Sequence, residues 1–237
     1  MSRLPGIRYG TGALVVKGIR IVGSGRVGSA VSARLRERGF KLTEDGAELV
    51  VLCVPDRAIE EAAQSVALGP WIAHTSGATP LAALAPHVRR FGLHPLQTFS
   101  RARGPEQLDG AAAGVSAESP EAREVGFWLA RELGLEPFEL ADAGRALYHA
   151  GAVVASNFLV TLHRAATDLV EAAGAPPEAL VLLMRRVIEN DFELTGPIER
   201  GDWETVEGHL AAIRERRPQL EPLYRALADA TAALAVR

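Results

Sequence analysis

The sequence predicts an α/β fold, a doubly wound and mostly parallel sheet, followed by an all-helical domain. Three observations predict this order. Short apolar runs alternate with amphipathic stretches from about residue 19 to 140. A glycine-rich turn, residues 23–28, joins the first run to the first amphipathic stretch. After about residue 141 only the helical period recurs. We therefore predict two domains, residues 1–142 and 143–237.

The composition argues against several classes of protein. The chain has 237 residues, 48% of them hydrophobic, and a net charge of −3, which gives no reason to expect binding to nucleic acid or to a membrane surface. No apolar run reaches the ~18 residues of a membrane span, and no signal-peptide pattern opens the sequence. Cys53 is the single cysteine, and the six histidines lack paired ligand spacing, so we expect a cytoplasmic protein without a metal site.

Seven apolar runs of the first domain have the length and composition of strands. The run 48–55 is continuously apolar until Pro55 stops it, as in a parallel strand buried on both faces. The run 112–116 is expected at an edge of the sheet, and an extra strand is expected around 13–16. The seven predicted strands are 19–22, 40–43, 48–55, 71–74, 91–94, 112–116 and 136–140.

Capping and breaking residues delimit the predicted helices. Gly39 ends the first helix, Asp56 is the expected N-cap of the second, and Pro80 opens the third. In the second domain Asp202 caps a helix and Pro218 starts the last one. The predicted helices are 26–38, 57–66, one from 79, 120–133, 145–173, 178–194, 202–216 and one from 218.

The glycine turn has the spacing of a dinucleotide-binding fingerprint. Gly23 allows the tight turn, Gly25 lets the backbone approach a pyrophosphate, and Gly28 lets helix and strand pack closely. The helix that follows offers unpaired N–H groups to phosphates. The alternative is a glycine-rich turn that binds nothing.

Polar residues follow three of the predicted strands. Ligands of doubly wound sheets bind outside the carboxyl ends of the strands, so these residues are expected to face one crevice. Each histidine alone is also compatible with a structural role. The residues at these strand ends are Val54, Pro55, Thr75, Ser76, His94, Gln97 and Thr98.

Two polar groups stand out in the helical part. His149 and Asn157 fall on one face of the long helix, flanked by small residues, which suits a ligand or a partner helix. Histidine and asparagine on an apolar helix are costly unless they are paired or used. Thr195 and Arg200 lie in a loop, where Arg200 could clamp a substrate carboxylate or merely belong to a connection.

Several motifs together resemble an uncharacterised bacterial family whose members are provisionally labelled NADP oxidoreductases. The motifs are the glycine turn, Val54-Pro55-Asp56, His74-Thr-Ser-Gly77, Leu93-His-Pro-Leu-Gln-Thr-Phe99, Tyr148-His-Ala150, Ala155-Ser-Asn157, Thr195-Gly-Pro197 and Arg200-Gly-Asp202. The family is similar to pyrroline-carboxylate reductase, 6-phosphogluconate dehydrogenase and ketopantoate reductase. The resemblance implies a Rossmann-like domain that holds NAD or NADP, a C-terminal helical domain of the 6-phosphogluconate dehydrogenase type, a small-molecule substrate between the two, and a homodimer built through the helical domains.

The sequence departs from this family in two places. The segment 40–48, which in the family contacts the adenosine ribose, is unusually short in this sequence. The short segment is compatible with weak or lost cofactor binding. Glu44 lies about 20 residues after the glycine turn, where an acid would bind the ribose 2′-OH and favour NAD. No lysine follows Lys41, so His149 is the acid/base candidate, because histidine is the residue type whose unperturbed pKa, ~6.5, suits proton exchange near neutrality; Asn157 would orient the substrate.

The leading hypothesis is an oxidoreductase that moves a hydride between NAD(P) and a small carbonyl or imine compound. One alternative is a non-catalytic ligand sensor or dimeric interaction protein with degenerate cofactor binding. Another is a nucleotide-dependent transferase or lyase. The predicted cofactor-binding residues are Gly23, Ser24, Gly25, Arg26, Val27, Gly28, Glu44, Val54, Pro55, Thr75 and Ser76. The predicted substrate-side residues are His94, Gln97, Thr98, Thr195 and Arg200.

Overall fold

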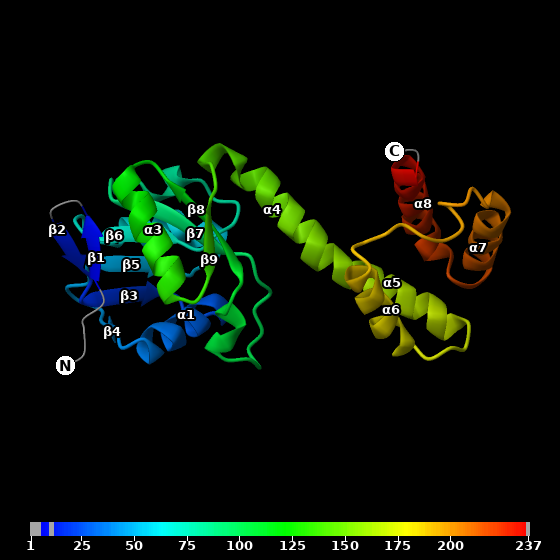
Figure 1. Cartoon of the computed structure of the whole chain (residues 1–237), viewed down its shortest axis with the longest axis horizontal. Coiled ribbons are helices and arrows are strands. Elements are labelled where there is room, and N and C mark those ends of the chain that lie inside the picture. Colours follow the sequence, from blue (N-terminus) through cyan, green and yellow to red (C-terminus); the bar gives the residue numbers. More distant parts are fainter. Residues whose placement is uncertain (1–5, 10–11, 236–237) are drawn as a thin grey trace. The chain divides into compact units, whose positions relative to one another are not determined.

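The computed structural model describes residues 6–9 and 12–235 (Figure 1). The chain separates into two compact units, Met1–Val153 and Val154–Arg237. The division falls inside the helical segment that follows the predicted boundary at residue 142. The 1–142 and 143–237 assignment itself stays a prediction, and its first five residues lie outside the described ranges.

A seven-stranded sheet organises the first unit. Its order is β4-β3-β5-β6-β7-β8-β9, and every neighbouring pair is parallel except β7 and β8. A separate antiparallel pair, β1 and β2, precedes it. The doubly wound, Rossmann-like fold class predicted from the sequence is confirmed. The strands are β1 Gly6–Tyr9, β2 Gly12–Val15, β3 Gly18–Val22, β4 Lys41–Leu42, β5 Leu49–Leu52, β6 Trp71–His74, β7 Arg90–Pro95, β8 Ala112–Ala117 and β9 Glu136–Glu139.

The edge position predicted for residues 112–116 is wrong. β8 lies between β7 and β9, and its residues Ala113, Val115 and Ser116 are buried. The small side chains of this strand weaken its apolar pattern in the sequence. In the fold the same small side chains leave room for helices against both faces of the sheet.

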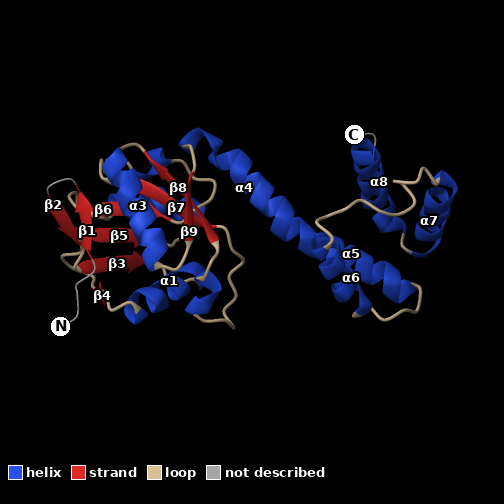
Figure 2. Cartoon of the chain, viewed as in Figure 1, coloured by secondary structure: helices blue, strands red, loops and turns tan. Residues whose placement is uncertain are grey.

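Helices cover both faces of this sheet (Figure 2). Two differ from the sequence expectation. Asp56 is not an N-cap, because it lies inside a 3₁₀ turn and its side chain makes no capping hydrogen bond. The helix expected from residue 79 is only a 3₁₀ turn, since Ala85, which precedes Pro86, is extended. The helical segments of this unit are α1 Arg26–Glu37, η1 Asp56–Ala58, α2 Ile59–Gln64, η2 Leu81–Leu84, η3 Pro105–Leu108, α3 Pro120–Glu132, η4 Asp142–Gly144 and α4 Arg145–Val153.

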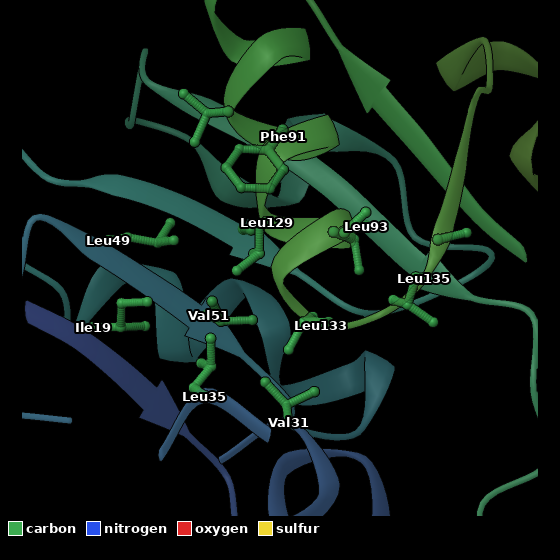
Figure 3. Close-up of a cluster of buried hydrophobic side chains, with 14 of the residues drawn as sticks. Ile19, Val31, Leu35, Leu49, Val51, Phe91, Leu93, Leu129, Leu133 and Leu135 are labelled. Carbon is green, nitrogen blue, oxygen red and sulfur yellow. The ribbon is translucent and has the colours of Figure 1, made fainter. Parts of the chain in front are cut away.

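The larger hydrophobic core lies between the sheet and the helices α1 and α3 (Figure 3). Ile19, Val51 and Phe91 of the sheet pack here with Val31 of α1 and Leu129 of α3, all of them buried. Because strand side chains alternate between the two faces, the intervening residues point the other way. A second cluster on that opposite face lies under α2 and η2 and includes Val50, Leu52, Ile59, Ile72 and Leu84.

The second unit consists of helices within the described residues (Figure 2). The helix predicted over 145–173 is interrupted by a π-helical turn, η5 Val154–Phe158, before α5 Leu159–Ala172. The helix predicted over 178–194 is shorter, α6 Ala179–Glu189, because Asp191 and Phe192 adopt positive φ angles. The remaining segments are α7 Trp203–Arg216, η6 Pro218–Leu220 and α8 Glu221–Ala235.

Asp202 caps α7 as predicted. Its carboxylate accepts the backbone N–H of Thr205 at 3.1 Å, which satisfies an otherwise unpaired donor of the first turn. Val206, Leu210 and Ala228 form a small buried cluster between α7 and α8. None of the helices in the described ranges has the length and apolar character needed to cross a bilayer.

Candidate functional site

The glycine turn has the geometry that its sequence predicts. Gly23 has a φ of 107°, and a Cβ placed on it would lie 2.5 Å from the carbonyl oxygen of Cys53. A Cβ on Gly28 would collide with the Gly23 carbonyl. At Gly25, by contrast, a Cβ would meet no atom within 4 Å. The first and third glycines therefore bring β3, β5 and α1 into contact, whereas the second leaves open space at the start of the helix.

This open space is a cavity of about 400 Å³. One wall is the start of α1 with Ser24, Gly25 and Arg26, and the other is the loop that contains Arg101 and Arg103. No acidic residue occupies the first turn of α1. The cavity thus combines unpaired helix N–H groups with three guanidinium groups, an arrangement suited to a phosphate-bearing ligand.

The sheet edge where an adenosine was expected is short, in keeping with the short segment 40–48. β4 pairs with β3 through only two residues, Lys41 and Leu42. The carboxylate of Glu44 lies 3.1 Å from Nε of Arg20, so the predicted ribose ligand is engaged in an exposed ion pair. Glu48 lies away from the glycine turn, at the amino end of β3, where its carboxylate accepts the N–H of Gly18 at 2.7 Å.

A second polar group lies on the sheet face opposite α1 and α3, where two glycines make room for the start of α4. His74, Gly92 and Ser116 are directly opposite one another on β6, β7 and β8, so they share this face. A Cβ on Gly92 would lie 2.7 Å from Nη1 of Arg145. In the same way Tyr148 packs over Gly114, with its ring 3.5 Å from the position of a Cβ there.

His94, Tyr148 and His149 converge at the carboxyl end of β7. The Tyr148 hydroxyl is hydrogen-bonded to Nδ1 of His94 at 2.9 Å. The rings of His94 and His149 stand perpendicular, with centroids 5.7 Å apart. Both rings contact Gly77, since a Cβ on this glycine would lie 2.9 Å from Nε2 of His94 and would collide with the His149 ring. The structure thus brings together the predicted residues His94 and His149.

Beneath these rings lie two buried side chains, His74 and Arg145. Arg145 is 1% exposed, and its guanidinium donates to the Ser116 hydroxyl at 2.8 Å and to the Ser76 carbonyl. Both ring nitrogens of His74, which is fully buried, lack a hydrogen-bond partner.

Burial controls the protonation of this group. Desolvation, followed by the charge of Arg145, lowers the pKa of His74 to about 3. Desolvation, followed by the neighbouring His149 and Arg145, lowers the pKa of His94 to about 4. Burial raises the pKa of the Tyr148 phenol. At neutral pH the hydrogen-bonded pair of Tyr148 and His94 is therefore uncharged.

The other predicted residues of the first unit have mixed positions. Val54 is half-buried beside the glycine turn, and Pro55 is exposed. The Ser76 hydroxyl accepts the N–H groups of Ala78 and Thr79, so it shapes the loop. The Gln97 amide is likewise occupied, because it donates to the Gln107 carbonyl at 2.9 Å and accepts the Thr98 N–H at 2.8 Å.

Three predicted site residues belong to the second unit. Asn157 lies in the π-helical turn and is exposed. Thr195 and Arg200 are exposed in the loop before α7. Their roles toward a ligand stay predictions.

Two kinds of site residue were not predicted from the sequence. Arg101 and Arg103 line the cavity and lie in the loop after β7, which is polar and arginine-rich in the sequence. Arg145 and Tyr148 were not predicted as site residues either. Tyr148 adjoins His149 in the sequence, which was a usable signal, whereas nothing local distinguished Arg145 from the other arginines. Among the described residues, no group of three or more His, Cys, Asp or Glu side chains could hold a metal ion.

Taken together, the fold and the glycine turn define a two-unit protein with a Rossmann-like sheet followed by helices. The sequence profile of a domain of unknown function (DUF2520) matches residues 111–231, and the chain belongs to this family. A comparison with curated protein sequences finds no match.

Three solved structures illustrate the fold. One, from Bacteroides fragilis, is provisionally described as an NADP oxidoreductase and is 22% identical, with a TM-score of 0.76, over 92% of this chain and 98% of that chain. Protein TM1727 from Thermotoga maritima is 24% identical, with a TM-score of 0.73, over 92% of this chain and 100% of that chain. A reductive aminase from Aspergillus terreus, in complex with NADPH and ethyl levulinate, is 17% identical, with a TM-score of 0.65, over 92% and 94% of the two chains. These likenesses establish the fold shared along most of the chain.

Proposed function

We propose that this protein is an NAD(P)-dependent oxidoreductase that moves a hydride to or from a small carbonyl or imine compound. The glycine turn and its cavity carry this proposal. Gly23 and Gly28 are sterically required, while Gly25 leaves the start of α1 open beside Arg26, Arg101 and Arg103. These residues fit the pyrophosphate of a dinucleotide, and the similarly folded reductive aminase from Aspergillus terreus is in complex with NADPH.

A bound nicotinamide would supply the hydride donor or acceptor. The chain would supply the groups that handle the proton and hold the substrate. His149 is half-buried and lies against Gly77 beside the His94 ring, so we assign it the role of proton donor. His94, held through Nδ1 by Tyr148, would present its other ring nitrogen toward the substrate.

The finer predictions extend this proposal. The substrate would also meet Thr195, Arg200 and Asn157 of the second unit.

The protein would act in the cytoplasm as a homodimer. Exposed apolar residues of α5 and α6 support a second copy as the partner, and these include Leu159, Val160, Val181, Leu182, Leu183 and Ile188. Sedimentation of the wild type and of Leu183→Glu would test the dimer, which the added charge should dissociate.

The direct test of the proposal is a titration with NADPH and NADH, followed through nicotinamide fluorescence. We expect micromolar affinity for at least one of them. The double variant Arg101→Ala/Arg103→Ala should bind at least about tenfold more weakly, with a reduced salt dependence, because two charged phosphate contacts are removed. Arg36→Ala, at the far end of α1, is the matched control and should bind normally. Binding weaker than millimolar to both cofactors would refute the redox function.

The role of His149 is tested separately. His149→Ala should reduce turnover while leaving cofactor affinity nearly unchanged. An equal loss of turnover and affinity would remove His149 from the acid/base role.

A second candidate function is a ligand sensor that has lost catalysis. The observation in its favour is the reduced adenosine side, where β4 has two paired residues and Glu44 is held by Arg20. A ligand-bound structure in which protein side chains fill the adenosine site would support this alternative.

A further inference from the structure

The buried Arg145 lacks an acidic partner within ion-pair distance among the described residues. Its two hydrogen bonds go to neutral oxygens, the Ser116 hydroxyl and the Ser76 carbonyl, and its Nε has no partner. The Ser116 hydroxyl in turn donates to the Leu140 carbonyl at 2.6 Å. A guanidinium stays charged in proteins, so this side chain places a nearly uncompensated positive charge inside the first unit.

The fold is built to hold this charge under the His94 and His149 rings. Gly92 lies beneath the guanidinium, and two residues later on the same face of β7 comes His94. The positive charge contributes to the lowered pKa values of His74 and His94. His94 carries the Tyr148 hydrogen bond on Nδ1, which leaves Nε2 beside Gly77 and His149.

The carboxylates near this group are few. Asp142 accepts the backbone N–H of Leu81 at 3.0 Å, and its charge acts on Arg145 from beyond ion-pair distance. Asp56 is exposed at the start of η1, and its charge acts on both His94 and Arg145. Neither makes an ion pair with Arg145, so no neighbouring carboxylate neutralises the buried guanidinium directly.

We propose that the site selects carbonyl compounds and their anionic analogues over protonated imines, with Arg145 acting as a fixed positive charge behind His94. This inference rests on the proposed redox function and specifies its substrate class. Arg145 would not touch the substrate. It would act through its field and through the position of the rings.

The chemistry of the two substrate classes differs in charge. When a carbonyl is reduced, its carbon gains a C–H bond by hydride transfer from the reduced nicotinamide, which is oxidised. The C=O π electrons move to the oxygen, which becomes negative and then takes a proton, in our assignment from His149. A nearby buried cation stabilises that oxygen. A protonated imine enters as a cation and becomes neutral, so the same charge opposes its binding.

The test uses three six-membered-ring probes that differ in charge: cyclohexanone, cyclohexanecarboxylate and the cyclohexylammonium ion. Each is titrated into the full chain, with and without NADP, while the His94 and His149 ring resonances are followed by NMR. We expect saturable shifts from the ketone and the carboxylate. The ammonium ion should bind more weakly by on the order of tenfold or more.

Variants of Arg145 separate charge from shape. Arg145→Lys should keep the preference for the ketone and the carboxylate over the ammonium ion. Arg145→Met should bring the ratio of these affinities toward one. If Arg145→Met does not fold, the wild-type probe series and Arg145→Lys still decide the question. Equal or tighter binding of the ammonium ion, or no shift of either ring by any probe, would overturn the inference. A failure of the proposed function is distinguishable, because NADPH would then not bind while the charge preference measured without cofactor would persist.

Discussion

The Tyr148 hydroxyl and Nδ1 of His94 lie 2.9 Å apart, which joins α4 to the carboxyl end of β7. Each group has a pKa shifted in the direction that keeps it uncharged at neutral pH. The hydrogen bond therefore fixes the orientation of the His94 ring without an ion pair.

Tyr148→Phe should release this ring. We expect the free energy of unfolding to fall by about 1 kcal/mol, because one hydrogen bond between partly buried groups is lost. The His94 ring resonance should shift or broaden, as measured by NMR. Tyr224→Phe is the matched control, since the Tyr224 hydroxyl is hydrogen-bonded to Nδ1 of His209 at 2.7 Å. An unchanged His94 resonance in Tyr148→Phe would contradict the positioning role.

Acidification should destabilise the first unit through His74 and His94. The native pKa of His94 is about 4 and that of His74 about 3, whereas unfolded histidine titrates near ~6.5. Below about pH 6.5 the unfolded state thus binds more protons than the native state. The stability contributed by each group is therefore intact above this pH and is lost as the pH falls toward the native pKa.

As the pH falls, each histidine should lower the free energy of unfolding by up to about 1.4 kcal/mol per pH unit. The effect of His94 should be smaller, because this side chain is partly exposed to solvent. Urea unfolding between about pH 6.5 and 5, followed through Trp71 and Trp128 in Trp203→Phe protein, measures the slope of the first unit. His94→Gln should remove the contribution of His94 to this pH dependence, whereas His209→Gln should leave the pH dependence unchanged. A free energy of unfolding that is independent of pH in this range would rule out the lowered pKa values of His74 and His94.

Gly77→Ala should disturb both histidine rings. The added methyl would collide with the His149 ring and approach Nε2 of His94, so both rings must move. We expect shifted resonances for both histidines and reduced turnover with unchanged NADPH affinity. Gly144→Ala, where a Cβ meets no atom within 4 Å, is the control. Normal turnover and unshifted rings in Gly77→Ala would show that this packing is unimportant.

Much of the fold could be predicted because its signals are local. The apolar run that ends at His74 marked β6 at its true bounds, and the spacing of Gly23, Gly25 and Gly28 predicted the turn. The burial of Arg145 could not be predicted in this way. It depends on Gly92, on the antiparallel pairing of β7 with β8, and on where α4 begins, and these are tertiary relationships between distant segments. The internal position of β8 was missed for the same reason.

The central claim is that the turn at Gly25 receives the phosphates of a dinucleotide. The most direct measurement compares NADPH binding to the wild type and to Gly25→Val by calorimetric titration, alongside thermal unfolding. A valine at this position meets no protein atom near its Cβ but fills the approach to the start of α1. We predict micromolar affinity for the wild type and at least about tenfold weaker binding for Gly25→Val, with both proteins equally stable. Equal affinity of the two proteins, or no binding to the wild type, would contradict the claim.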